Sequence, residues 1–140
     1  MGRIMKVVNL NRKQLEDIES RLEEYDEKHI TYRLEGEIHI GIEEEGKIIA
    51  GLDAEMTAFK ILYVSTLFVD EAYRRKGYGT RLVQEMEKKA HQLGANMIRL
   101  DTFDWQGKEF YKAMGYEIVG SYENKIDGFA EYFFLKRLAD

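Results

Sequence analysis

KILYVSTLFV, residues 60–69, is followed at once by DEAYRRKGYG, residues 70–79, and this junction organises the whole chain. The first segment is apolar and rich in β-branched residues, which predicts a buried central strand. The second segment is polar and carries two glycines, which predicts a loop. Apolar residues then recur at helical spacing from Thr80 to Leu93, and Gly94 is a suitable residue to end the helix that this spacing predicts.

Strands and helices alternate outward from this junction. Asn11 is predicted to cap a helix, because apolar residues recur behind it every three or four positions, at Leu15, Ile18, Leu22 and Tyr25. Alternating apolar residues on either side of Glu45-Gly46 predict a hairpin. The predicted elements also include a short helix over residues 108–114 and strands over residues 5–10, 38–42, 47–56, 97–102, 116–121 and 130–138.

This order of elements predicts the α/β class. We expect a single domain over residues 1–140, folded as a three-layer sandwich with helices on both faces of the sheet. The sheet should be mixed and mostly antiparallel. Residues 60–102 read as strand, helix and strand, which predicts a parallel pair joined by a right-handed crossover.

Composition narrows the classes of function. The chain has no cysteine, so disulfides and thiol nucleophiles are excluded and a cytoplasmic location is expected. A net charge of −5 argues against nucleic-acid binding; it suits a cationic partner such as an amine, or it simply keeps the protein in solution. No apolar run reaches the roughly 20 residues of a membrane span, so no membrane partner is expected. The three histidines, His29, His39 and His91, lack metal-ligand spacing, so no metal is expected either.

The loop before the predicted helix has the chemistry of an anion site. Arg74, Arg75 and Lys76 supply positive charge, and Gly77 and Gly79 let the backbone approach an anion closely. The first amides of a helix are unpaired and carry a partial positive charge, so a pyrophosphate is the natural ligand. The residue order matches neither the phosphate loop of nucleotide hydrolases nor the three-glycine dinucleotide fingerprint. The alternative is a basic surface turn before an ordinary helix.

Two segments resemble motifs of the GNAT N-acetyltransferase superfamily. Residues 67–80, LFVDEAYRRKGYGT, are similar to its acetyl-CoA motif, Arg/Gln-x-x-Gly-x-Gly/Ala after a strand ending in Leu-x-Val. Residues 110–116, FYKAMGY, resemble its Leu-Tyr-x-x-x-Gly-Phe segment. The separation of the two motifs and the order of elements also agree, so the resemblance covers nearly the whole chain. It implies a GNAT-like sandwich in which the two central parallel strands splay apart and the thioester enters the gap.

The resemblance implies acetyl-CoA as the co-substrate. Its pyrophosphate would lie on the backbone amides of residues 75–80, and its pantetheine arm would pair like an extra strand with residues 67–69. The cofactor-binding residues that follow from the two motifs are Leu67, Phe68, Val69, Arg74, Arg75, Lys76, Gly77, Tyr78, Gly79 and Thr80. Members of the family are often homodimers, so the resemblance also allows a homodimer.

By the same resemblance Tyr111 is the general acid that protonates the departing thiolate, and its alternative role is aromatic packing against the sheet. Many members carry a glutamate on the central strand that helps to remove the proton of the amine, but this chain has Ser65 there. The general base is therefore not assigned. The residues that remain open for this role, beside a chain of water molecules, are Asp53, Glu55, Asp101 and Glu131, with His39 as the one histidine to test.

Two further features of the sequence bear on ligand binding. Gln106 stands near the position of an asparagine that often touches the cofactor in the family. The first predicted helix is acidic, and either it is a solvated helix face or it attracts the amine through Glu23, Glu24, Asp26 and Glu27.

The function expected from these observations is transfer of an acetyl group from acetyl-CoA to a primary amine of a small molecule or peptide. The alternative is a non-catalytic module that binds or senses acyl-CoA, which the missing strand glutamate would permit. A third reading is a nucleotide-binding protein that uses the same loop for another diphosphate.

Overall fold

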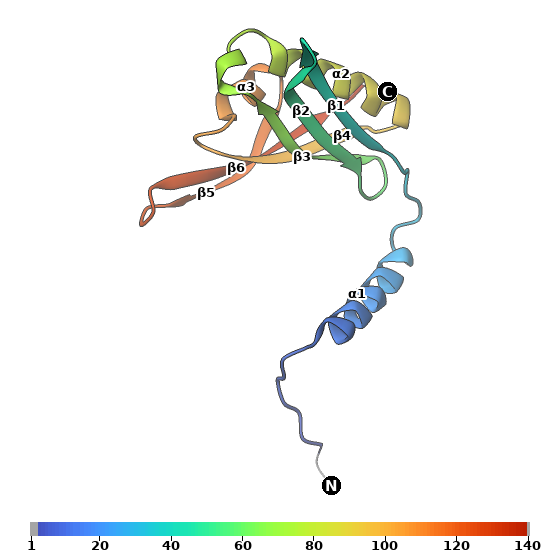
Figure 1. Ribbon diagram of the computed structural model, residues 1–140. Coiled ribbons are helices and arrows are strands. Elements are labelled where there is room, and N and C mark those ends of the chain that lie inside the picture. The colour runs from blue at the N-terminus through green and yellow to red at the C-terminus, as the bar shows by residue number, and fades with distance from the viewer. Residues whose placement is uncertain (1–2, 140) are drawn as a thin grey trace. The chain divides into compact units, whose positions relative to one another are not determined.

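The computed structural model describes residues 3–139 (Figure 1). The chain divides into two compact units, Met1–Thr31 and Tyr32–Asp140. The first unit holds helix α1, and the second holds the sheet with helices α2 and α3.

In the first unit, α1 spans Arg12–Glu27 and begins with the predicted cap. The Asn11 side chain accepts from the backbone N–H of Gln14 at 2.8 Å, and the Gln14 side chain accepts from the backbone N–H of Asn11 at 3.0 Å. This reciprocal pair is a capping box, which satisfies two of the amides that a helix start leaves unpaired. The apolar stripe of α1 lies at the surface of its unit, with exposed fractions of 42% for Leu15 and 59% for Leu22.

The strand predicted over residues 5–10 is wrong. Within the described part of the first unit these residues form no strand. A strand satisfies its backbone N–H and C=O groups only through a neighbour, so an apolar run without one leaves those groups to water. Val7 and Val8 are accordingly exposed.

The second unit is built on a six-stranded sheet in the order β1-β2-β3-β4-β6-β5. The strands are β1 (Glu37–Glu44), β2 (Lys47–Met56), β3 (Ile61–Val69), β4 (Met97–Phe103), β5 (Glu117–Asn124) and β6 (Phe129–Arg137). The predicted hairpin is confirmed, because Glu45 and Gly46 both have positive φ between paired Glu44 and Lys47. Two consecutive positive φ values give the turn whose twist matches two antiparallel strands.

Among the strands of residues 3–139, β3 and β4 form the one parallel pair, and they separate after a short contact (Figure 1). Their pairing is limited to Ile61 with Met97, Leu62 with Ile98, and Tyr63 with Arg99. From Val64 to Val69, β3 stays paired with β2 but has left β4. The splayed central pair that the family resemblance implied is therefore confirmed. Its consequence is an open strand edge inside the sheet.

A β-bulge interrupts β3 at the start of this open edge. Asp53 pairs with Thr66 and Ala54 pairs with Val64, so Ser65 is the extra residue on β3. A bulge redirects side chains and is frequent beside active sites.

Helix α2 (Tyr78–Leu93) packs on one face of the sheet through Leu82, Val83, Met86 and Ala90, and ends at Gly94 with a φ of 91° as predicted. Helix α3 (Lys108–Ala113) contributes the buried Tyr111 to the same core. The α/β class and the mixed, mostly antiparallel sheet are thus as predicted. A helical layer on the opposite face stays a prediction, since α1 belongs to the other unit.

Candidate active site

The first turn of α2 presents unpaired amides. Gly77 is the N-cap residue, with a φ of 83°, and no side chain among residues 3–139 caps the helix. The backbone N–H of Arg81 makes the first bond of the helix, to the carbonyl of Gly77 at 3.1 Å. The N–H groups of Tyr78, Gly79 and Thr80 therefore have no partner within the helix, and the first turn carries no acidic residue. Such a start attracts an anion.

The two glycines of the loop serve different purposes. A Cβ on Gly77 would meet nothing within 4 Å, so the space in front of the cap is open, but its φ favours glycine. A Cβ on Gly79 would lie 3.4 Å from the Phe110 ring and 3.9 Å from Val69. Gly79 thus lies in ordinary van der Waals reach of α3 and of the end of β3. Arg75 also has a positive φ, 63°, so the turn before α2 contains two left-handed residues.

The three basic side chains of the loop do not act alike. Arg74 donates from Nε to the carbonyl of Val69 at 2.8 Å and lies 5.4 Å from the centre of the Phe68 ring. It therefore ties the loop to the end of β3 instead of standing as mobile charge. Lys76 lies over the Tyr73 ring at 5.5 Å, and Arg75 is exposed. Arg75 and Lys76 are the charges best placed to meet an anion on the amides.

The open edge of β3 leads directly to this turn. Leu67, Phe68 and Val69 pair with β2 on one side, whereas β4 has diverged on the other. Leu67 and Val69 pack against the core, and Phe68 is 54% exposed. An extended ligand can pair with the vacant side of a strand as a further strand would. Residues 67–69 end β3, and residues 75–80 form the turn and the first residues of α2 that follow it; their role in binding the cofactor stays a prediction.

Tyr111 combines a packed ring with an unpaired hydroxyl. Its ring is 7% exposed and lies against Phe134, Tyr116 and Phe110. A Cβ on Gly107 would come within 3.0 Å of this ring, so Gly107 makes room for it. Burial raises the pKa of Tyr111 to about 12, so the phenol keeps its proton at neutral pH. Among residues 3–139 no hydrogen bond engages its hydroxyl, and no side-chain polar atom there is both buried and unpaired, so water reaches it.

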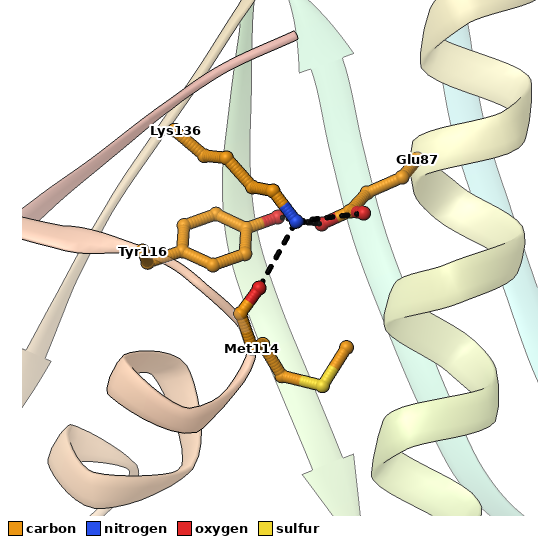
Figure 2. Close-up of polar contacts among 4 residues, drawn as sticks. All are labelled: Glu87, Met114, Tyr116 and Lys136. Carbon is orange, nitrogen blue, oxygen red and sulfur yellow. Dashed lines mark hydrogen bonds and ion pairs between the residues drawn. The ribbon is translucent and has the colours of Figure 1, made fainter.

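A polar network that the sequence did not predict holds α3 in place (Figure 2). Lys136 of β6 donates from Nζ to both carboxylate oxygens of Glu87, at 3.1 and 3.0 Å, and to the carbonyl of Met114 at 3.0 Å. The Tyr116 hydroxyl donates to the same carboxylate at 2.8 Å. Burial and the neighbouring Glu87 carboxylate raise the pKa of Tyr116. The network joins α2, β6 and the end of α3.

This network also bears on Tyr111. The backbone N–H of Tyr116 donates to the carbonyl of Tyr111 at 2.9 Å, and the two rings lie 5.6 Å apart. The Glu87–Lys136 pair is largely withdrawn from water, with side-chain exposures of 19% and 25%. Fixing Tyr116 and Met114 therefore fixes the helix that carries Tyr111.

We expect Lys136→Met to lower the free energy of unfolding by about 2–3 kcal/mol, because Glu87 loses its cationic partner and keeps only the hydrogen bond from Tyr116. Urea denaturation measures this loss. The matched control is Lys89→Met, which removes an exposed pair with Glu85 at 3.8 Å and should cost less than about 0.5 kcal/mol. Equal losses of unfolding free energy in the two variants would show that the network stabilises the fold no more than an exposed ion pair does.

The residues left open as bases fall into separate environments. Asp101 accepts from the Tyr63 hydroxyl at 3.1 Å, Glu131 accepts from the Tyr122 hydroxyl, and Glu55 is exposed on β2. Asp53 instead joins two side chains, Ser65 and His39. The acidic residues Glu23, Glu24, Asp26 and Glu27 lie on or after α1 in the first unit.

Gln106 has a defined structural task. Its Oε1 accepts from the backbone N–H of Phe103 at 2.8 Å and from the Thr102 hydroxyl at 3.4 Å. Thr102 in turn accepts from the N–H of Gly107 at 3.1 Å. Gln106 therefore closes the end of β4 and shapes the start of α3. Within residues 3–139 no group of three His, Asp or Glu side chains could hold a metal, and no described helix is long and apolar enough to cross a membrane.

The fold and site together define an α/β protein with an uncapped helix start and an open inner strand, the arrangement expected of a transferase that uses a diphosphate-bearing donor. The model of the acetyltransferase (GNAT) family matches residues 4–116. This chain belongs to that family and is an acetyltransferase by class.

Individual relatives agree with the family match. A blasticidin-S acetyltransferase of Streptomyces morookaense is 29% identical over 96 residues, covering 68% of this chain and 70% of that protein. An L-ornithine N5-acetyltransferase of Arabidopsis thaliana is 34% identical over 58 residues, but the match covers 40% of this chain and 25% of that protein. A crystal structure of an acetyltransferase from Bacillus cereus ATCC 14579 has a TM-score of 0.89 and 33% identity, covering 96% and 98% of the two chains. An aminoglycoside 6′-N-acetyltransferase complexed with coenzyme A shares the fold at 19% identity and a TM-score of 0.64, over 93% of each chain.

Proposed function

We propose that this protein transfers the acetyl group of acetyl-CoA to a primary amine of a small molecule or peptide. The observation that carries the proposal is the uncapped start of α2 at the end of an open strand edge. The relatives support the amine acceptor, because one is named for blasticidin S and another for L-ornithine. The fold relative complexed with coenzyme A supports the donor.

The residues present suit the donor. The amides from Arg75 to Thr80 would receive the pyrophosphate, with Arg75 and Lys76 adding charge, since the space before Gly77 is open. The edge formed by Leu67, Phe68 and Val69 would receive the pantetheine arm by strand-like pairing. When bound, acetyl-CoA supplies an activated acyl group as a thioester. Arg74 holds the loop against β3, so its contribution is to the shape of the cradle.

We propose that Tyr111 supplies a proton to the leaving sulfur. Phe110, the residue before it, contacts the position of Gly79, so α3 lies beside the start of α2. The Tyr111 ring contacts Phe134, which pairs with Leu100 of β4. We infer that α3 borders the gap between β3 and β4 and brings to it a protonated hydroxyl that makes no hydrogen bond with residues 3–139. A backbone N–H of the open edge, at or beside Phe68, would stabilise the oxyanion.

Calorimetry with acetyl-CoA, CoA and ATP tests the donor, and CoA release with a panel of primary amines, including L-ornithine and blasticidin S, tests the reaction. We expect both CoA compounds to bind, ATP to bind weakly, and at least one amine to be acetylated. Tight ATP binding without CoA binding would favour a nucleotide-binding protein. CoA binding without acetylation of any amine would favour the non-catalytic module.

The charge of the loop yields a separate prediction. The double variant Arg75→Gln, Lys76→Gln should bind acetyl-CoA about 3- to 10-fold more weakly, because two cations near the diphosphate are lost. Its affinity should also depend less on salt concentration than that of the wild type. Calorimetry at two ionic strengths measures both effects. The control is Lys88→Gln, Lys125→Gln, which removes the same charge from exposed positions away from the cradle; equal weakening there would point to net charge alone.

We also propose that the protein acts in the cytoplasm. A chain without cysteine suits a reducing compartment, and the cytoplasm also supplies acetyl-CoA. The single domain over residues 1–140 and the homodimer remain predictions. Analytical ultracentrifugation measures the oligomeric state.

A further inference from the structure

A chain of polar side chains crosses three strands beside the splayed pair. The Ser65 hydroxyl of β3 donates to Oδ2 of Asp53 on β2 at 3.1 Å, and it also lies 3.3 Å from the carbonyl oxygen of Asp53. Oδ1 of Asp53 lies 3.1 Å from Nε2 of His39 on β1. Glu37 is the next group along, 3.6 Å from the same nitrogen. The bulge at Ser65 makes the chain continuous, because the extra residue brings its hydroxyl to the Asp53 carboxylate.

This chain ends where the gap in the sheet begins. The last paired residue of β3 on the β4 side is Tyr63, so Ser65 is two residues into the separation. Asp53 lies between Leu52 and Ala54, whose side chains are buried, so its carboxylate projects from the face opposite α2. Tyr111, in contrast, belongs to the core that α2 covers. Asp53 and Tyr111 therefore lie on opposite faces of the sheet, and the contact with Ser65 brings the Asp53 carboxylate to the strand that borders the gap.

Space for a ligand adjoins Asp53. A cavity of about 430 Å³ is lined by His39, Asp53 and Thr66 and includes the paired glycines Gly41 and Gly51. Because Gly41 and Gly51 have no side chains and lie opposite each other on neighbouring strands, the surface of the sheet is hollowed there. The exposed Ile48 side chain also lines the cavity, whereas the side chains of Ala50 and Leu52, two further lining residues, are buried in the core. The Asp53 carboxylate and the apolar Ile48 side chain together suit an amine carried on a carbon chain.

We propose that Asp53 binds the ammonium group of the acceptor, and that Ser65 and His39 are positioning residues that hold its carboxylate. The inference rests on the proposed acetyl transfer and names the residue that recognises its acceptor. A carboxylate has about four lone-pair sites, and Ser65 and His39 occupy two, so capacity remains for an ammonium donor. Position 65 on β3, where many family members carry a glutamate, is a serine in this chain, and the carboxylate is instead that of Asp53 on the neighbouring strand β2.

Asp53 holds the ammonium group, which loses one proton to solvent water, and the neutral nitrogen then attacks the thioester carbon. The C–N bond forms and the C–S bond breaks, with its electron pair going to sulfur. Sulfur takes the Tyr111 proton, and the second proton of the new amide nitrogen restores Tyr111.

The test compares Asp53→Asn with Glu55→Gln, which makes the same change of carboxylate to amide two residues along the same exposed face. The probes are the best primary amine of the panel and hydroxylamine, a nucleophile that is largely uncharged at neutral pH. We expect Asp53→Asn to lower kcat/KM for the amine about 10- to 100-fold, mainly through KM, because a charge-assisted hydrogen bond is lost. The rate with hydroxylamine and the acetyl-CoA affinity should change less than about twofold. Glu55→Gln should leave all three unchanged, and Ser65→Ala should cause a smaller loss of the same kind.

The outcomes separate this inference from the proposed function. Equal effects of Asp53→Asn and Glu55→Gln, or equal loss with both nucleophiles, would overturn the role of Asp53 while acetyl transfer by the wild type stands. If the wild type acetylates no amine and binds no CoA compound, the proposed function fails and the acceptor site fails with it. Circular dichroism confirms that each variant is folded, and the exposed position of Asp53 makes that the expected result.

Discussion

Gly77→Glu will lose at least about 100-fold in affinity for acetyl-CoA. The cap position has open space before it, so the new side chain fits in the free protein and places a carboxylate where the diphosphate would lie. Like charges brought together cost several kcal/mol, and each 1.4 kcal/mol is tenfold in affinity. Isothermal calorimetry of the variant against the wild type measures the loss.

A matched glycine separates charge from backbone strain. Gly77 has a φ of 83° and Gly128 a φ of 75°, and a Cβ at either residue would meet nothing within 4 Å. Any non-glycine residue pays roughly 1–2 kcal/mol for such a backbone, so Gly77→Glu and Gly128→Glu should lose similar stability. Only the first should lose acetyl-CoA binding. If Gly77→Glu bound acetyl-CoA with unchanged affinity, the diphosphate would not bind at the start of α2.

Tyr111→Phe will lower turnover about 100-fold or more while acetyl-CoA affinity stays within about twofold, because general acid catalysis typically contributes 10²–10⁴-fold. Steady-state kinetics and calorimetry give the two values. The free energy of unfolding should change by less than about 1 kcal/mol, since the lost hydroxyl makes no hydrogen bond within the described residues.

The neighbouring tyrosine supplies the control. The Tyr116 hydroxyl donates to Glu87, so Tyr116→Phe should lower stability by about 1–3 kcal/mol. Its turnover should fall much less than that of Tyr111→Phe. Normal turnover in Tyr111→Phe would refute the acid role and leave aromatic packing as the task of that residue.

Much of the site could be predicted because its signals are local. The Asn11 cap and the helix end at Gly94 each depend on residues within one helical turn, and both are confirmed, whereas α2 begins at Tyr78, two residues before the predicted start at Thr80. The Glu45-Gly46 hairpin is local in the same sense. Local backbone preferences act within a few residues, so a single sequence reveals them.

The remainder depends on pairings between distant segments. Glu87 and Lys136 are 49 residues apart, and no spacing rule connects them. Asp53 reaches Ser65 only because a bulge shifts the register of β3 by one residue. The error at residues 5–10 has the same origin, because an apolar run becomes a strand only when a partner strand is present.

The most direct test of the account is a titration of ¹⁵N-labelled protein with acetyl-CoA, followed by the backbone amide signals of Tyr78, Gly79 and Thr80. Amides that donate to a phosphate are strongly polarised, so these three signals should shift far more than those of the opposite end of α2 near Leu93. Saturating shifts at the start of α2 are the predicted result. Binding of acetyl-CoA that leaves the three signals in place would contradict the account.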